Sequence, residues 1–290
     1  MLRPWGAGGA GHERPAASWP SSCSACTGGA PAAPSPPPYD GPLWVAPNPT
    51  LDLWHDPGAA GRVVTCDQPV LGESYAEPFT GGGEVGETAR SGLDEGRDDG
   101  LWSGLDDDAM LEVRAEADRV LYAYEADGRV LQAVVMHRGR VAPGRGAGPD
   151  GIAWFVESSA RCDVVEYPDG LAEQQGAEVW TDGRGRRVSS QVVTSSTSDG
   201  DCLQQGTRVL YVDRDGSGDE RAYLRNTADY PDHVDEPFRA DVPLPAGAVD
   251  SGYRHGEEQL WFAADHRGAY VGGPDRFERW PLETQVLGCA

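Results

Sequence analysis

The sequence predicts an α+β fold made mostly of antiparallel β-hairpins, with one or two short helices. Two runs rich in β-branched and aromatic residues, Arg119–Ala126 and Arg129–His137, are separated only by Asp127-Gly128. This dipeptide supplies the two positive φ angles of a type I′ turn, so the runs predict a two-residue hairpin. Shorter β-rich runs joined by Asp and Gly turns continue toward the C-terminus, which favours antiparallel strands throughout.

The segments beside this hairpin complete a predicted four-stranded antiparallel sheet. Met110–Ala117 alternates polar and apolar residues, as a half-buried strand does, and Ile152–Glu157 is rich in β-formers. Glu84–Asp99 is the best helix candidate in the chain, although three glycines within it weaken it. Upstream, Arg62–Cys66 predicts a further short strand.

Three shorter hairpins are expected in the second half of the chain. They pair Glu178–Thr181 with a run ending at Val188, Thr207–Val212 with Glu220–Leu224, and Gln259–Ala263 with Ala269–Val271. We therefore expect an N-terminal half, residues 41–175, and a β-rich C-terminal half, residues 176–290, packed together as one unit. Most of seven aromatic residues are expected to lie in the core, with a sugar-binding platform as the alternative. They are Trp102, Trp154, Trp180, Trp261, Trp280, Tyr122 and Tyr124.

Residues 1–40 predict a disordered tether. Gly, Ala, Ser and Pro dominate this segment, which ends in a proline-rich spacer. Such a composition buries too little apolar surface to offset the entropy lost on ordering. The proline end is expected to be an extended, semi-rigid spacer.

Cys26 precedes this spacer, as the lipidated cysteine of a bacterial lipoprotein does. Small residues come before it and a Gly, Ser and Pro tether follows. A lipoprotein signal also needs an apolar run upstream, and residues 3–22 contain none. The prediction of lipidation at Cys26 thus requires a signal upstream of Met1, and the alternative is a cytoplasmic protein with an irregular tail.

Four cysteines lie in the expected folded part: Cys66, Cys162, Cys202 and Cys289. Their even number, with no CxxC spacing, favours disulfides in an oxidising compartment over a metal or redox site. Of the three possible pairings we predict Cys66–Cys162 and Cys202–Cys289, because each closes one half of the chain. The alternative is four buried free thiols.

The charge of the chain excludes several partners. The formal net charge is −23, and all 24 cationic side chains are Arg. Nucleic acids and anionic membranes both require clustered cations, so we expect neither as a partner. No apolar stretch is long enough to span a membrane. We expect a soluble monomer.

Several segments resemble an uncharacterised family of secreted or lipid-anchored proteins from GC-rich actinobacteria. The segments that carry the resemblance are Pro42–Val45, Asp118–Tyr124, Val156–Asp163, Ala240–Pro245 and Leu287–Ala290. The resemblance implies a location outside the cytoplasm, and it implies no activity.

Few motifs carry chemistry. The six histidines show no zinc-protease spacing, each is expected at the surface, and GxSxG is absent. The one metal candidate is an acidic turn that resembles the start of a calcium loop, in which alternate oxygens converge on an ion. Its ligands would be Asp213, Asp215, Ser217 and Asp219, but position twelve is Leu224 where calcium loops have Glu. An acidic hairpin turn without an ion is the alternative, and no other cofactor is expected.

Together these observations predict a non-catalytic extracytoplasmic domain that binds a protein or an envelope component, or acts structurally. One alternative is a secreted hydrolase with carboxylates dispersed in the sequence. Another is a calcium-stabilised envelope protein. An enzyme should show a concave pocket with two facing carboxylates or a His–acid pair, whereas a binding module should show an exposed aromatic or apolar patch.

Overall fold

The computed structural model describes residues 38–285 with internal gaps. The gaps are residues 49, 52–54, 81–84, 99–104, 106–107, 145–148, 175, 198–205 and 214–219. Several predicted features therefore lie outside the described residues: residues 1–37 of the predicted tether with the lipidation site Cys26, the bridge Cys202–Cys289, and the calcium candidates Asp215, Ser217 and Asp219.

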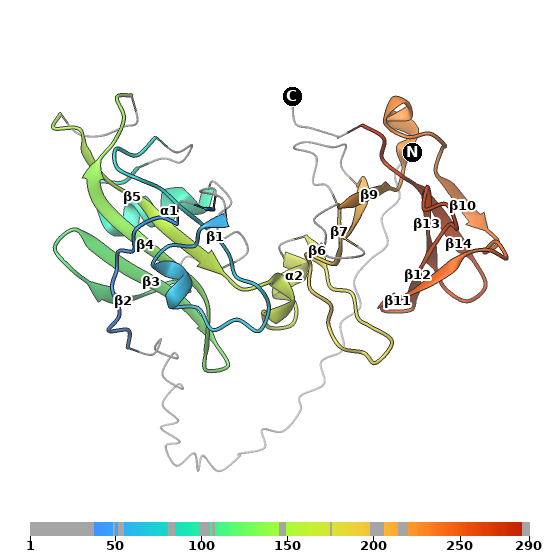
Figure 1. The fold of residues 1–290 in the computed structure, drawn as a ribbon, viewed down its shortest axis with the longest axis horizontal. Helices are drawn as coiled ribbons and strands as arrows, with labels where there is room; N and C mark the ends of the chain where they lie inside the picture. Colours follow the sequence, from blue (N-terminus) through green and yellow to red (C-terminus); the bar gives the residue numbers. More distant parts are fainter. Residues whose placement is uncertain are drawn as a thin grey trace, which may run out of the picture. The chain divides into compact units, whose positions relative to one another are not determined.

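The first sheet has five antiparallel strands in the order β1-β5-β4-β3-β2 (Figure 1). It contains the predicted hairpin, since Asp127 and Gly128 both have positive φ angles, 53° and 77°. The helix α1, Ala89–Asp98, falls within the segment predicted to be helical. The strands are β1 Leu71–Ser74, β2 Leu111–Ala115, β3 Arg119–Ala126, β4 Arg129–Arg140 and β5 Ile152–Arg161.

The remaining strands form two further antiparallel sheets. One has four strands in the order β6-β7-β8-β9, and the other has five in the order β10-β14-β13-β12-β11. The first consists of β6 Ala177–Glu178, β7 Val193–Thr197, β8 Arg208–Val212 and β9 Arg221–Leu224. The second consists of β10 Arg239–Val242, β11 Val249–His255, β12 Glu258–Phe262, β13 Gly268–Gly272 and β14 Phe277–Pro281.

The helices are few and short. Besides α1 they are α2 Leu171–Gln174 and the 3-10 turns η2 Ala60–Arg62, η3 Val164–Glu166, η4 Thr227–Asp229 and η5 Pro231–His233. The fold is thus mostly antiparallel β, and the predicted α+β label fits only loosely. None of the helices in the described part of the chain is long and apolar enough to cross a membrane.

The predicted strand at Arg62–Cys66 is wrong. Its first residue ends η2, and Thr65 is held beside the sheet by a backbone hydrogen bond to the Val130 carbonyl, 2.8 Å. Pro34–Ala290 forms one compact unit, and the boundary that we predict near residue 175 stays a prediction.

The two faces of the first sheet are both buried. Leu121, Ala133 and Val135 pack on one face against the segment that contains η2, and Tyr122, Val134 and Met136 pack on the other face beside α1. A separate core in the C-terminal half surrounds Trp180 and Trp280, which are fully buried, as predicted for these aromatic residues.

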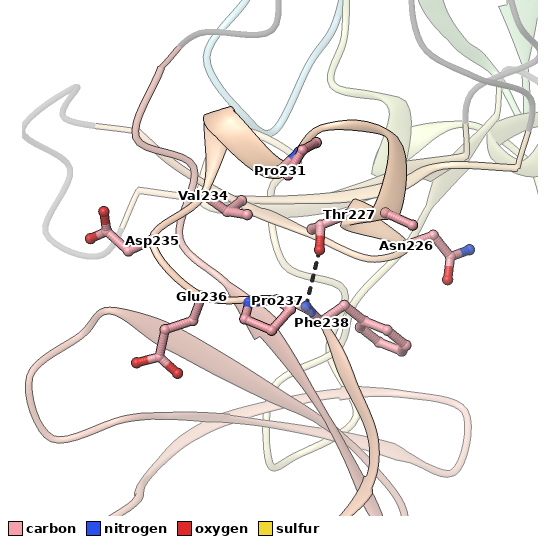
Figure 2. A pocket seen from close by; sticks show the side chains of 9 residues that line it. Asn226, Thr227, Pro231, Val234, Asp235, Glu236, Pro237 and Phe238 are labelled. Atoms are coloured by element: carbon pink, nitrogen blue, oxygen red, sulfur yellow. Dashed lines mark hydrogen bonds between the residues drawn. The ribbon is translucent and has the colours of Figure 1, made fainter.

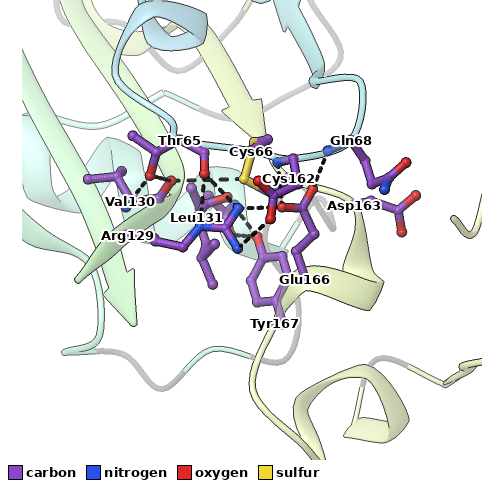
Figure 3. The surroundings of a disulfide bond; sticks show 12 residues. Thr65, Cys66, Gln68, Arg129, Val130, Leu131, Cys162, Asp163, Glu166 and Tyr167 are labelled. Atoms are coloured by element: carbon purple, nitrogen blue, oxygen red, sulfur yellow. Dashed lines mark hydrogen bonds and ion pairs between the residues drawn. A yellow bond between two sulfur atoms is a disulfide. The ribbon is translucent and has the colours of Figure 1, made fainter. Parts of the chain in front are cut away.

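Cys66 and Cys162 form the predicted disulfide, with an S–S distance of 2.02 Å. Figure 3 shows that Arg129 of β4 lies beside it and reaches the carboxylate of Glu166. Glu166 also accepts hydrogen bonds from the backbone N–H groups of Asp67 and Gln68, 2.7 and 2.9 Å. The bridge therefore fastens the segment before β1 to the end of β5.

We expect the double substitution Cys66→Ser, Cys162→Ser to lower the free energy of unfolding by on the order of 4 kcal/mol. The bridge closes a loop with a sequence separation of 96, which restricts the unfolded chain strongly. Urea denaturation followed by tryptophan fluorescence measures the loss. Wild-type protein with reductant should show a similar loss, and an unchanged midpoint in both would contradict this role of the bridge.

Candidate functional site

Glu157 occupies a β-bulge in β5 and lies on the buried face of the first sheet that also carries Val135. Val135 pairs with Ser158 while Met136 pairs with Val156, so Glu157 is the extra residue in the ladder. Without the bulge, Glu157 and Ser158 would point to opposite faces, since side chains alternate along a strand. The bulge instead lets both residues line one cavity.

An arginine and a histidine on the neighbouring strands bind the buried carboxylate of Glu157. Arg119 on β3 binds it in a bidentate manner, with its Nε and Nη2 both 2.8 Å from carboxylate oxygens. His137 on β4 places its Nδ1 3.0 Å from Glu157 Oε1. Arg119 and His137 are register partners, so the β3–β4 hairpin positions both side chains toward the bulge.

Electrostatics follow from this packing. Burial raises the pKa of Glu157, but the hydrogen bonds from His137 and Arg119 outweigh it and hold that pKa below the ordinary value. The hydrogen bond to Glu157 likewise raises the pKa of Arg119. Asp118, half exposed, completes the group: its Oδ2 accepts from Arg119 Nη1 at 2.8 Å and lies 3.7 Å from His137 Nε2.

A cavity of about 210 Å³ opens over this cluster, and we call it the Glu157 cavity. One wall is the segment around Gly58, which approaches the sheet very closely: a Cβ there would lie 2.8 Å from Ser158 Cβ. Asp56 fixes this wall, because its carboxylate accepts hydrogen bonds from the N–H groups of Asn48, 2.7 Å, and Gly58, 3.0 Å.

Two serines on paired strands form the inner surface of the Glu157 cavity. Ser158 Oγ accepts a hydrogen bond from the Ala60 N–H at 3.2 Å. Its register partner Ser74 is only 5% exposed, and its Oγ has no hydrogen-bond partner among the residues that the structure describes. A buried hydroxyl without a partner costs about 1–3 kcal/mol, so Ser74 is a group that a ligand could satisfy.

The rim of the Glu157 cavity combines an aromatic ring with an acid. Trp44 lines it and is 53% exposed, which is unusual for so large an apolar side chain. Glu77 also lines it, and its Oε1 accepts from the Arg140 N–H at 2.9 Å. Gly139 lets Glu77 and His137 approach each other, since a Cβ at residue 139 would lie 3.0 Å from His137 Cε1 and 3.2 Å from Glu77 Cδ.

Sequence reasoning missed this site. His137 was expected at the surface, and this is wrong: it is 6% exposed and packs against the ring of Phe155, with centroids 5.2 Å apart. The bulge has no signature in the sequence, because Glu157 simply ends a run of β-formers. The one available signal was the ionisable triplet Arg119, His137 and Glu157 on three segments predicted to be adjacent strands.

A second buried charge cluster lies in the C-terminal half. Arg208 on β8 is paired with Glu178 and with Glu258, whose Oε2 is 2.9 Å from Arg208 Nη2, and its guanidinium lies 5.1 Å from the Trp280 ring centre. Ser195 donates to Glu178 and accepts from Trp180 Nε1 at 3.0 Å. The polar groups of this cluster are thus paired with one another, which is typical of a structural network.

A larger cavity lies around η4 and η5. It measures about 510 Å³ and is lined by residues of the segment Asn226–Phe238. Figure 2 shows Thr227 accepting a hydrogen bond from the Phe238 N–H, 3.0 Å, and the two acids that line the cavity, Asp235 and Glu236. Both carboxylates are already paired, Asp235 with Arg267 and Glu236 with Arg279. They are therefore less available to a ligand than the buried Ser74 hydroxyl of the Glu157 cavity, which has no partner among the described residues.

Of the calcium candidates only Asp213 is described. It follows β8, and its charge adds to burial in raising the pKa of Glu220, which directly precedes β9. The two carboxylates are therefore neighbours across the hairpin, and the calcium site stays a prediction.

The comparisons with known proteins give no relative. No family model matches the chain, and neither a curated protein nor a solved structure is similar to it. The resemblance to the actinobacterial family stays a prediction, and the function has to be inferred from the site alone.

The Arg208 cluster predicts a defined pH dependence. The ion pair with His255 and the hydrogen bond from Arg208 lower the pKa of Glu258 to about 2, and the same ion pair raises the pKa of His255. The Glu258 contribution is complete above its unfolded pKa of 4.5 and is lost as the pH falls toward 2. The His255 contribution is complete below its unfolded pKa of 6.5 and is lost as the pH rises through its raised folded pKa.

We therefore expect Glu258→Gln to destabilise the protein most between pH 4.5 and 6.5, with a smaller difference from wild type on either side. Urea denaturation across this pH range measures the difference. The exposed neighbour Glu257→Gln is the matched control and should leave the profile unchanged. A difference that does not vary with pH would contradict the pairing.

Proposed function

We propose that this chain is a non-catalytic extracytoplasmic binding domain, anchored through Cys26 in its lipidated form, and that the Glu157 cavity is its ligand site. The observation that carries the proposal is a buried Ser74 hydroxyl without a hydrogen-bond partner among the described residues, in a cavity beside the exposed ring of Trp44. Small-molecule sites typically combine an apolar wall with a few converging polar groups. The ligand would be a small group of an envelope component.

The arrangement of the charges favours binding over catalysis. A serine nucleophile needs a hydrogen bond to a base, and Ser74 Oγ has no such partner in the described part of the chain. A general base needs a nitrogen that faces the substrate, but both ring nitrogens of His137 face carboxylates, those of Glu157 and Asp118. The cluster therefore holds the cavity wall in place.

The disulfide supports the extracytoplasmic part of the proposal. Structural disulfides persist in oxidising compartments and are rare in the reducing cytosol. Cys162 is 1% exposed, and Glu166 and Arg129 pair beside the bridge, which is the environment of a structural bridge.

The proposal predicts that blocking the mouth of the Glu157 cavity abolishes ligand binding. Ala76 is exposed and lines the cavity, so Ala76→Trp should fill the mouth without disturbing the core. A library of amines, amino acids, polyols and sugars is screened by ligand-observed NMR with wild type and variant. At least one compound should bind wild type and lose its signal with Ala76→Trp.

The matched control is Ala246→Trp, which adds the same ring at an exposed turn position far along the chain. It should bind the same compounds as wild type. The proposal fails if no compound distinguishes Ala76→Trp from the control.

A second candidate function, a secreted hydrolase, is favoured by one observation. The Glu157 cavity is concave and contains a His–acid pair, His137 and Glu157, with a further carboxylate on Glu77. Such a pair can act as a general base or acid when substrate reaches it.

This alternative is tested with nitrophenyl glycosides and esters. We expect no turnover above buffer, because His137 is held between carboxylates. Turnover that falls about 100-fold or more in His137→Gln, with the circular dichroism spectrum retained, would replace the binding proposal by hydrolysis. Turnover equal in wild type and His137→Gln would be a contaminant and would leave the binding proposal in place.

A further inference from the structure

The geometry points to a neutral, hydroxylated ligand for the Glu157 cavity, namely a single sugar ring stacked on Trp44 and hydrogen-bonded to Ser74. This inference rests on the proposed function and adds the class of ligand to it. Three properties of the cavity carry it: its charge balance, its unsatisfied hydroxyl and its exposed ring.

The charge balance selects against charged ligands. Both oxygens of Glu157 accept from Arg119, and Oε1 also faces His137. Asp118 accepts from Arg119 and lies beside His137 Nε2. An anionic ligand would find Arg119 already bound to Glu157 and would also face Glu77.

A cationic ligand is disfavoured for the opposite reason. The carboxylates of Glu157 and Asp118 already face cations, and Glu77 Oε1 accepts from the Arg140 N–H. To bind in the cavity, a cation would have to shed its hydration shell and compete with these partners, which costs more than it recovers. A neutral ligand needs no such exchange.

The polar groups of the cavity that can still form hydrogen bonds are suited to the hydroxyls of a ligand. Ser74 Oγ can donate one hydrogen bond and accept others, and Ser158 Oγ can still donate while it accepts from the Ala60 N–H. Adjacent hydroxyls of a sugar ring can match two such oxygens on paired strands. The second oxygen of Glu77 adds an acceptor at the rim.

The aromatic ring and the volume fit one sugar. Trp44 is 53% exposed at the rim, where its face is available to the C–H face of a sugar ring. The cavity volume of about 210 Å³ equals about seven liquid-water volumes of about 30 Å³ each. That is the size of one ring, so a longer glycan would extend outward past Trp44.

The test uses three probes that share one ring and differ in charge: glucose, glucosamine and glucuronate. Galactose and N-acetylglucosamine are added as further neutral rings. Saturation-transfer NMR on the wild-type protein should detect the neutral rings at millimolar concentration and give no signal for glucuronate. Glucosamine should bind no more tightly than the neutral rings.

Variants separate a binding role from a structural role. Trp44→Ala should weaken binding about tenfold, whereas Trp44→Phe should retain most of it because the stacking face remains. Ser74→Ala should weaken binding about threefold to tenfold and leave the melting temperature unchanged or raised, since it removes an unsatisfied buried hydroxyl. A structural role for Ser74 would instead lower the melting temperature.

The outcomes distinguish this inference from the proposed function. Binding of neutral rings that depends on Trp44 and Ser74 supports both. Two results overturn the inference of a neutral sugar and keep the binding domain: binding of glucosamine but of no neutral ring, and binding only of non-sugar compounds that Ala76→Trp abolishes. Failure of every compound to distinguish Ala76→Trp from Ala246→Trp overturns both.

Discussion

The compensation of one buried carboxylate determines much of the N-terminal half. Glu157 is 8% exposed, and an unpaired carboxylate at such a depth would cost several kcal/mol. The structure meets this cost with a bidentate arginine and a histidine from two adjacent strands. Both partners come from the β3–β4 hairpin, and the type I′ turn at Asp127-Gly128 together with the register shift between Tyr124 and Glu125 sets the pairing that places them. A slip of the β3–β4 hairpin by one residue against β5 would turn both side chains to the face opposite Glu157.

The bulge and the cavity are two consequences of this arrangement. An unbroken ladder would place Ser158 on the face opposite Glu157, and the cavity would lose its inner hydroxyl. The outer wall is then supplied from upstream, where Gly58 has a positive φ of 51° and comes within van der Waals contact of the serine strands. The disulfide holds the segment after this wall to the end of β5, so wall and sheet are joined covalently as well as by hydrogen bonds.

The sequence predicted the parts of this fold that depend on local patterns. The hairpin followed from Asp127-Gly128, the neighbouring strands from their alternation and β-branched residues, and the bridge Cys66–Cys162 from the even cysteine count. The sequence could not predict strands that are stable only because they pair with a neighbouring strand. β7, Val193–Thr197, is mostly Ser and Thr, and it forms because β8 lies beside it. The candidate site shows the same limit, since the pairing of His137 with Glu157 depends on register across β4 and β5, a long-range property that nothing local marks.

The same cluster bears on the choice between catalysis and binding. A catalytic His–acid pair works when one nitrogen is held and the other faces the substrate. In this chain the second nitrogen of His137 faces Asp118, and the acid is saturated by Arg119. The pair therefore has its proton acceptors inside the protein, and the groups left for a ligand are hydroxyls and a ring. A site of this kind can recognise a sugar by shape and hydrogen bonds without moving a proton.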